Sequence, residues 1–376
     1  MRLLINVNSA SFLISHRFEV ACGARDSGFE VHIAADSDSA DEVTTLRSAG
    51  FHFHHIRLRR GGRNPIEDLL YLQRIRALVR EIRPQVIHNV TVKPVVYGTL
   101  AARAAGVPGI VNAVSGLGYS FAGVNSRRFI SSLVKGAYRF ALKRPGLKII
   151  FQNEDDIEMF VRAGLIDRRQ SVLIRGSGVD LDVFSAEEEL EGDPVVVMPA
   201  RMLRDKGVLE FAEAARLLLA EGRNASFILA GKLDRANPAG LRKEELLQLA
   251  QRSGVKWVGH VMDMASLYKN SHIVCLPSYR EGLPKCLIEA CAAGRAIVTT
   301  DVPGCRDAVR HFENGILVPP RDSSALAEAL KMLLDDARLR KKMGAAGRAR
   351  AEAEFDVCAV VRDTLGVYES VLGGNS

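Results

Sequence analysis

Long apolar runs, cysteine pairs and tryptophan are absent or scarce in this chain. No stretch of its 376 residues approaches the roughly 18 consecutive apolar residues of a membrane-spanning helix. The apolar run at the N-terminus is too short for a signal peptide and leads into an expected strand, so we expect a cytosolic protein. The six cysteines form no Cys-x-x-Cys pair, which disfavours a zinc site and favours buried, reduced thiols.

Composition and charge narrow the class of protein. Apolar residues make up 47% of the chain and charged residues 25%, which is typical of globular domains and excludes a disordered or coiled-coil protein. Residues 51–150 contain 17 basic against 3 acidic residues, a local charge of +14, whereas residues 186–376 contain 26 against 27. The basic first half indicates an anionic partner: a nucleic acid, an anionic membrane surface or a phosphate-bearing substrate.

Short β-rich segments alternate with amphipathic helical segments in both halves of the chain. This alternation predicts an α/β protein with two doubly wound parallel sheets, each covered by helices on both faces. Residues 186–194 are acidic, end in Asp-Pro and are expected to form an exposed linker. The expected domains are therefore residues 1–185 and 195–355, followed by a last helix at 356–376. Two such domains form a cleft, and ligands bind beyond the carboxyl ends of the strands.

The loop after the expected strand at 273–277 is the strongest candidate site. Its sequence, SYREGLPKCLIE at 278–289, turns at Gly282 into a helix, so the N–H groups from Leu283 onward are expected to form an anion site. Glu281 precedes the helix and Glu289 lies about one turn inside it. A carboxylate there can accept two hydrogen bonds from a vicinal diol such as ribose. The alternative is that both glutamates are solvated surface residues.

A basic loop follows the first strand of the second half. PARMLRDKG at 199–207 contains Arg201, Arg204 and Lys206. Arginine offers phosphate a planar fork and lysine a point charge, and two such charges can support a departing diphosphate without a metal. The alternative is a solvated basic loop.

The loops of the first half carry weaker signals. His88 and Lys93, at and after a strand, are expected to face the cleft, and His16 opens a helix after the first strand. Gly116 and Gly118 follow another strand and permit close approach to the backbone. A single histidine after a strand is more often a hydrogen-bonded structural residue, and this alternative stays open.

Together these segments resemble the retaining glycosyltransferases of the glycogen-synthase and sucrose-synthase superfamily, specifically family 4. The resemblance rests on Arg201-x4-Lys206, on EGLPKCLIEA at 281–290 and on TDVPG at 300–304. The first half adds FLISHR, KPVVYGTLAAR, VNAVSGLGY and GSGVD, which start at residues 12, 93, 111 and 176. These are similar to the branch that makes bacterial capsule, O-antigen and lipid-linked oligosaccharides, and the match covers nearly the whole chain.

The resemblance implies the GT-B fold, in which two Rossmann-like domains face each other and the C-terminal one holds a nucleotide sugar. It implies that Arg201 and Lys206 grip the diphosphate. It also implies that Gly282 and Leu283 offer backbone N–H groups to the diphosphate or the sugar.

The resemblance further implies that Glu289 holds the ribose hydroxyls and that Glu281 contacts the transferred sugar. The base is expected near residues 257–261, which include Gly259, mostly on backbone groups. Many relatives carry two alternating histidines after the strand that contains His88, and here Val90 stands at the second position. The usual sugar contact is therefore in doubt, and Lys93 or the loop at 116–119 is expected to replace it.

We expect the mechanism to need no metal or other cofactor. Retention without an obvious nucleophile favours front-side substitution, in which the leaving phosphate takes the acceptor proton. The Asp-x-Asp segments at 36–38 and 180–182 spell the metal signature of a different transferase fold, but are expected in a surface loop and a turn.

Residues 127–144 predict a basic amphipathic helix. Basic residues at 128, 135, 139 and 143 form one stripe beside apolar faces, a composition that suits an anionic membrane surface, and the stretch 57–63 could add to it. The alternative is a core helix with a solvated basic face. Nucleic acid fits worse, because few aromatic residues interleave the basic run.

The sequence thus predicts a hexosyltransferase of bacterial surface polysaccharide assembly, including capsule, O-antigen and lipopolysaccharide. The expected donor is a UDP-sugar, N-acetylated or 6-deoxy, and the expected acceptor is a polyprenyl-diphosphate-linked saccharide at the inner face of the cytoplasmic membrane. Alternatives are a GDP-sugar, a soluble acceptor, a nucleotide-sugar epimerase on the same fold or a catalytically silent membrane-binding scaffold. An oxidoreductase is disfavoured, because no Gly-x-Gly-x-x-Gly follows the first strand.

Overall fold

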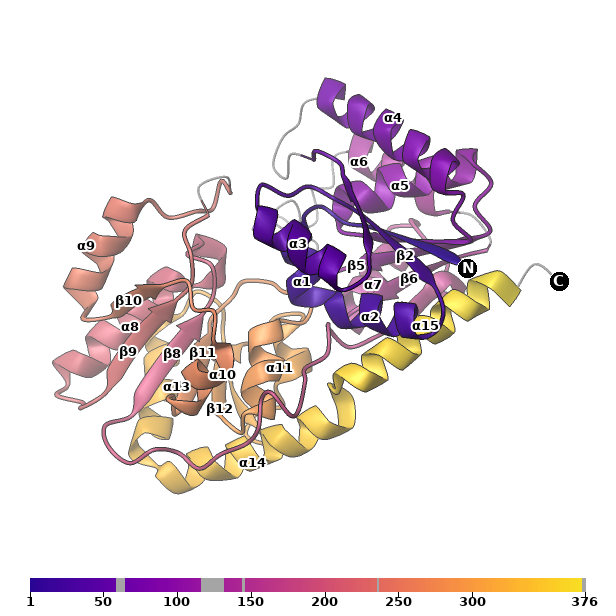
Figure 1. Ribbon diagram of the computed structural model, residues 1–376. Coiled ribbons are helices and arrows are strands. Elements are labelled where there is room, and N and C mark those ends of the chain that lie inside the picture. The colour runs from indigo at the N-terminus through magenta and orange to yellow at the C-terminus, as the bar shows by residue number, and fades with distance from the viewer. Residues whose placement is uncertain (59–64, 116–131, 144–145, 235–236, 374–376) are drawn as a thin grey trace. The chain divides into compact units, whose positions relative to one another are not determined.

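The computed structural model describes residues 1–58, 65–115, 132–143, 146–234 and 237–373. Its internal contacts divide the chain into two units (Figure 1). The first unit comprises Met1–Ser177 and Cys358–Ser376, and the second comprises Gly178–Val357. Each unit is built on one parallel sheet, as the alternation of segments predicts.

The first sheet has the strand order β3-β2-β1-β4-β5-β6-β7, and all neighbouring strands are parallel. The strands are β1 (Arg2–Asn6), β2 (Glu30–Ala35), β3 (His52–His55), β4 (Val86–Val90), β5 (Gly109–Val114), β6 (Leu147–Phe151) and β7 (Ser171–Leu173). The helices are α1 (Ala10–His16), α2 (Phe18–Asp26), α3 (Ala40–Ser48), α4 (Pro65–Ile82), α5 (Val92–Ala104), α6 (Ser132–Leu142), α7 (Glu154–Arg162) and α15 (Val357–Gly373). The strand order reverses between β1 and β4, and such a switch point is where doubly wound sheets bind ligands.

The second sheet has the order β10-β9-β8-β11-β12-β13 and is also parallel throughout. The strands are β8 (Val195–Pro199), β9 (Ser226–Ala230), β10 (Lys256–Gly259), β11 (Ile273–Leu276), β12 (Ala296–Thr300) and β13 (Gly315–Val318). The helices are α8 (Val208–Ala220), α9 (Lys243–Ser253), α10 (Met264–Lys269), α11 (Lys285–Ala292), α12 (Cys305–Ala308), α13 (Ser323–Asp335) and α14 (Ala337–Glu354). Its switch point lies between β8 and β11.

Local sequence explains most of these elements. Strands covered on both faces are near-continuous apolar runs, and every residue of β5, β11 and β12 is buried. Several helices begin at a polar side chain that accepts a backbone N–H: Ser39 before α3, Asn153 before α7 and Asp336 before α14. None of the helices in the described part of the chain combines the length and apolar composition that a membrane span requires.

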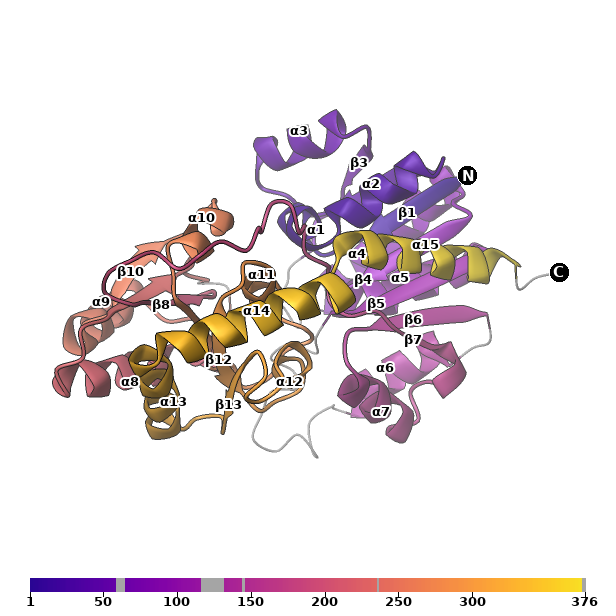
Figure 2. The same cartoon turned by 90° about the horizontal axis from the view of Figure 1, so that it is seen from below.

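The last helix, α15, packs on the first unit. Figure 2 shows it running along the strands of the first sheet. A Cβ on Gly23 of α2 would lie 2.3 Å from Val361, and one on Gly109 of β5 would lie 2.8 Å from Val371. Both glycines therefore allow the helix to lie close to the rest of the unit.

The expected exposed linker at 186–194 is attached to the second unit more firmly than its composition suggests. The Glu189 side chain is 8% exposed and pairs with Arg340 of α14, with Nη2 3.0 Å from Oε2. The carbonyls of Glu187 and Leu190 bond the side chains of Arg295 and His272 at 3.0 and 2.9 Å. Most residues of the linker are exposed, as its composition predicts, and basic partners far along the chain nevertheless bind this acidic segment.

Candidate functional site

Lys206 and Glu281 meet at the carboxyl edge of the second sheet. Lys206 lies in the loop between β8 and α8 and donates to Oε1 of Glu281, which lies between β11 and α11. Ser278 also donates to that oxygen, at 2.6 Å. The side chains of Lys206 and Glu281 are only 19% and 12% exposed. A Cβ at Gly207, whose φ is 79°, would lie 2.2 Å from the Pro277 carbonyl oxygen, so only glycine lets the two loops approach this closely.

The charge of Lys206 is held in place by its surroundings. Burial by itself lowers the pKa of this ammonium, but the charge and hydrogen bond of Glu281 outweigh burial, and the pKa lies above its ordinary value. Asp205, which the sequence analysis missed, is next to it: burial raises the pKa of this carboxyl, and its Oδ1 is buried without a hydrogen-bond partner. Asp205 could have been identified from the sequence, because it is an acidic residue between two basic residues of the same loop.

Arg201 lies on the same loop but has a different partner. Its Nη1 lies 2.6 Å from Oδ2 of Asp234, and its side chain is 46% exposed. Its charge nevertheless acts on the buried pair, because it lowers the pKa of Lys206. The loop therefore carries Lys206 part-buried, at 19% exposure, and Arg201 exposed.

The loop that contains Gly282 and Leu283 is packed against the TDVPG segment. Leu283 is 5% exposed, and Glu281 N donates to the Pro303 carbonyl at 3.1 Å. A Cβ at Gly304, whose φ is 82°, would lie 2.5 Å from the Gly282 carbonyl oxygen. The two motifs quoted from the sequence are thus one structural unit in front of α11.

Glu289 is buried inside α11, at 6% exposure. Tyr268 donates to its Oε2 at 2.9 Å, and Lys285 lies 3.6 Å from its Oε1. Burial raises the pKa of this carboxyl. The alternative of two solvated surface glutamates is therefore wrong for Glu281 and for Glu289.

Gly259 ends β10 with a φ of 77°. Its carbonyl accepts from Gly231 N at 2.6 Å, and Trp257 Nε1 donates to the Gly231 carbonyl at 2.8 Å. The segment expected near the base thus lies beside the end of β9, at the same carboxyl edge.

In the first unit, the expectation that His88 faces a cleft is wrong. The strand β4 continues to Val90, so His88 lies in its middle, 1% exposed, with Nδ1 2.7 Å from the hydroxyl of Tyr368 on α15. Burial, and then the charge of Arg17, lower the pKa of His88 to about 3. The structural alternative for this histidine is therefore confirmed. Lys93 pairs with Asp68 of α4 at 2.7 Å.

His16 and Arg17 lie at the junction of α1 and α2. His16 stacks on Phe12, with ring centroids 4.4 Å apart. Arg17, which the sequence analysis did not single out, is 5% exposed and donates to Ser115 Oγ at 3.2 Å and Ser177 Oγ at 3.4 Å. Burial lowers its pKa to about 10. Arg17 is the last residue of the FLISHR segment at 12–17, which was quoted above only as part of the resemblance.

Several expectations fall on or near residues that the structure does not describe. Gly116 and Gly118 lie outside the described residues, as do residues 59–63 and 127–131 of the two basic stretches. Of the expected amphipathic helix, α6 is described, and a surface pocket beside it is lined by Arg103, Gly136, Arg139, Phe140 and Lys143.

The carboxylates of the two Asp-x-Asp segments make local contacts. Asp36 accepts from Leu58 N at 2.9 Å and lies 3.0 Å from His55 Nε2. Asp180 accepts from the backbone N–H groups of Asp182 and Val183 at 2.9 and 3.0 Å. The second of these is the turn that the sequence predicts.

Comparison with known proteins adds to this geometry. Residues 182–350 match the family model "Glycosyl transferases group 1", and residues 2–153 match "Glycosyl transferase 4-like". The chain is 28% identical, over 99% of both chains, to the N,N'-diacetylbacillosaminyl-diphospho-undecaprenol alpha-1,3-N-acetylgalactosaminyltransferase of Campylobacter jejuni. It is 26% identical, over 72% of both chains, to the Escherichia coli UDP-Gal:alpha-D-GlcNAc-diphosphoundecaprenol alpha-1,3-galactosyltransferase.

A solved structure supports the fold. The crystal structure of Anabaena HepE in complex with UDP superposes with a TM-score of 0.78 at 19% identity, covering 98% of this chain and 100% of that one. With the two Rossmann-like sheets described above, this likeness confirms the expected α/β GT-B fold.

Proposed function

Because the chain belongs to the group 1 glycosyltransferases of the family 4 type, we propose that it moves a hexose from a UDP-sugar to a polyprenyl-diphosphate-linked saccharide. The relatives from Campylobacter and Escherichia act on undecaprenyl-diphosphate-linked sugars by name, and the Anabaena structure holds UDP. We further propose that the anomeric configuration is retained and that catalysis needs no metal. The product belongs to a bacterial surface polysaccharide.

The buried Lys206–Glu281 pair is the observation that carries this proposal. A lysine that is kept charged at the carboxyl edge of a doubly wound sheet is placed to bind the diphosphate of a nucleotide sugar. Arg201 adds a second, exposed cation on the same loop. When the diphosphate binds, Lys206 turns from Glu281 toward the phosphate oxygens, and Glu281 becomes available to a sugar hydroxyl.

Groups around the Lys206–Glu281 pair bind the remaining parts of the nucleotide sugar. Backbone N–H groups at Gly282 and Leu283 face the diphosphate or the sugar, and Glu289 receives the ribose hydroxyls. Tyr268 and Lys285 fix the Glu289 carboxylate in its buried position. The base lies at Gly259, on backbone groups.

The chemical step is a front-side substitution. The bond between the anomeric carbon and the diphosphate oxygen breaks, and the acceptor oxygen forms a bond to the same face of that carbon. The acceptor proton passes to the leaving phosphate, so no separate base is needed. Lys206 and Arg201 stabilise the negative charge that develops on the diphosphate, which is the main contribution such fixed charges make to catalysis.

We place the protein at the inner surface of the membrane that carries its acceptor. Arg103, Arg139 and Lys143 gather around one surface pocket beside α6, and basic side chains of this kind bind anionic headgroups. Flotation with anionic liposomes tests the placement: we expect binding at low salt that Arg139→Glu combined with Lys143→Glu abolishes. A protein that stays off the liposomes at every salt concentration would refute it.

Transfer to a defined acceptor tests the function. We expect release of UDP from one UDP-hexose only when a polyprenyl-diphosphate-linked saccharide is present, with an α-linkage from an α-linked donor seen by NMR, and unchanged in EDTA. Conversion of the donor in the absence of acceptor would indicate an epimerase. Preference for GDP-sugars, inversion, or rescue of an EDTA-treated enzyme by manganese would each overturn the corresponding part of the proposal.

A further inference from the structure

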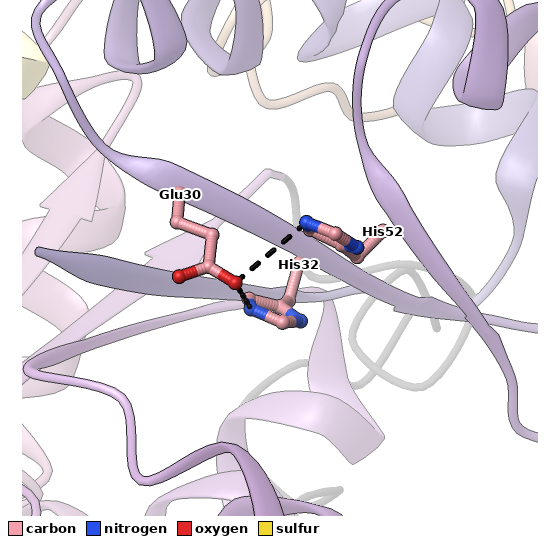
Figure 3. Close-up of side chains that lie close together, drawn as sticks. All are labelled: Glu30, His32 and His52. Carbon is pink, nitrogen blue, oxygen red and sulfur yellow. Dashed lines mark hydrogen bonds and ion pairs between the residues drawn. The ribbon is translucent and has the colours of Figure 1, made fainter.

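A second group of titratable side chains lies on the first sheet, away from its carboxyl edge. Glu30 and His32 are the first and third residues of β2, and His52 is the first residue of the edge strand β3. His32 and His52 are register partners, and side chains two residues apart point to the same face, so the three groups share one face of the sheet. Figure 3 shows the Glu30 carboxylate pointing between the two imidazole rings.

The distances within this cluster match those between the ligands of a tetrahedral metal ion. Oε1 of Glu30 lies 3.2 Å from His32 Nε2 and 3.6 Å from His52 Nε2, and the ligand atoms of all three residues lie within 4.8 Å of one another. Zinc ligands at about 2.0–2.2 Å in a tetrahedron are separated by about 3.3–3.6 Å.

His54 orients the central imidazole. Its Nε2 lies 3.0 Å from His32 Nδ1, and its ring stacks on that of His32 at 5.3 Å. In the structure Nε2 of His32 donates to Glu30 Oε1, and when a cation replaces that proton, the other tautomer, with the proton on Nδ1, donates to His54. A ligating histidine usually donates its other N–H to such a neighbour, which fixes the tautomer.

The cluster is accessible and its charge is not neutralised by a basic side chain. The side chains of Glu30 and His52 are 50% and 58% exposed, whereas that of His32 is 10% exposed. Among the residues that the structure describes, Glu30 has no lysine or arginine within ion-pair distance. A cation can therefore reach a carboxylate that is surrounded by imidazoles.

We propose that Glu30, His32 and His52 bind one zinc-like transition-metal ion that ties the edge strand β3 to β2. Two imidazoles and one carboxylate select zinc, cobalt or nickel over magnesium and calcium, and leave a fourth position for water. The ligands lie at the amino ends of their strands, whereas ligands of the catalytic kind bind at the carboxyl ends. The ion therefore lies away from the catalytic edge and links β3 to β2, and this inference does not depend on the function proposed above.

Metal titration of the full chain, without a polyhistidine tag and after treatment with a chelator, tests the site. We expect calorimetry to give one Zn²⁺ per chain, and Co²⁺ to give the visible absorption of a tetrahedral complex. His52→Ala removes an exposed ligand without disturbing the core and should weaken zinc binding at least about tenfold. Glu30→Gln keeps the size of the side chain and should have a similar effect.

His55→Ala is the matched control. His55 is on the same strand and equally exposed at 57%, but it points to Asp36 rather than to the cluster. Its removal should leave zinc affinity within about twofold, and zinc should raise the unfolding temperature of the wild type and of this variant only. Absence of one-to-one binding, or equal affinities of the wild type, His52→Ala and Glu30→Gln, would overturn the inference.

Discussion

Two buried arginines, one in each unit, have opposite kinds of partner. In the second unit, Arg340 is 6% exposed, pairs with Glu189 at 3.0 Å and donates to the Leu333 carbonyl at 2.7 Å. In the first unit, Arg17 is 5% exposed, and among the described residues its partners are hydroxyls and carbonyls, with no carboxylate. The ion pair with Arg340 holds the segment at 186–194 in place, whereas the described partners of Arg17 leave its charge without a carboxylate. The comparison therefore separates an arginine that is paired with a carboxylate from one that is not.

Removal of Glu189, the carboxylate that pairs with Arg340, should have the largest effect on stability. Glu189→Ala leaves Arg340 as a buried cation without a carboxylate, which costs roughly 3–5 kcal/mol when one partner of a buried pair is lost. Urea unfolding of the second unit should show the loss. The exposed Glu188→Ala is the control and should change stability by less than about 0.5 kcal/mol. A loss below about 1 kcal/mol for Glu189→Ala would mean that Glu189 does not balance Arg340.

A charge that acts in catalysis should affect rate rather than stability. Lys206→Ala should lower kcat/KM at least about 100-fold, on the scale of losing one oxyanion donor, because the departing diphosphate loses a fixed cation. Arg204→Ala is the control from the same loop, because Arg204 is 47% exposed and pairs with Glu245. Steady-state UDP release measures both. A rate within about threefold of wild type for Lys206→Ala would refute the proposal that Lys206 stabilises the departing diphosphate.

The lowered pKa of the buried His88 predicts how the stability of the protein depends on pH. Its pKa of about 3 lies below the ordinary 6.5, so the folded state favours the neutral ring. The stability this contributes is fully present above pH 6.5 and falls as the pH drops toward 3, by at most about 1.4 kcal/mol per unit. Wild type should therefore lose its advantage over His88→Gln between pH 7 and 5. Parallel stability curves for the two proteins would contradict this.

Arg17→Met should give the smallest stability effect. Because no carboxylate is left unpaired and the cost of burying a charge disappears, unfolding free energy should change by less than about 1 kcal/mol. The pKa of His88 should rise, because Arg17 now lowers it. Urea unfolding and NMR titration of the His88 ring measure these changes. A loss as large as that of Glu189→Ala would remove the distinction between the two arginines.

Elements with a strong local signal were predictable. The helix α4 begins at Pro65 and ends at Ile82, because proline suits a first helical turn and the apolar residues recur at helical spacing. The strand expected at 273–277 is an apolar run, and the structure places β11 at Ile273–Leu276. The loops that contain Lys206 and Glu281 could be identified because each follows such a run.

Other elements had no such signal. The helix α14 was missed because its buried face contains glycine and arginine as well as apolar residues: a Cβ at Gly344 would lie 2.0 Å from the Gly294 carbonyl oxygen. The edge strand β3 was missed because its sequence is His-Phe-His-His. Both elements depend on neighbours that are distant along the chain.

The order of apolar runs and the residue types of the loops by themselves determined the two parallel sheets and the carboxyl edge where Lys206 and Glu281 lie. Only the tertiary structure decided the partners: that Lys206 pairs with Glu281, that Glu189 holds Arg340, and that α15 buries His88. The physical reason is the distance along the chain over which each effect acts. Periodicity and turn chemistry act over a few residues, whereas the pKa of a buried group and the balance of its charge are set by side chains that meet only after folding.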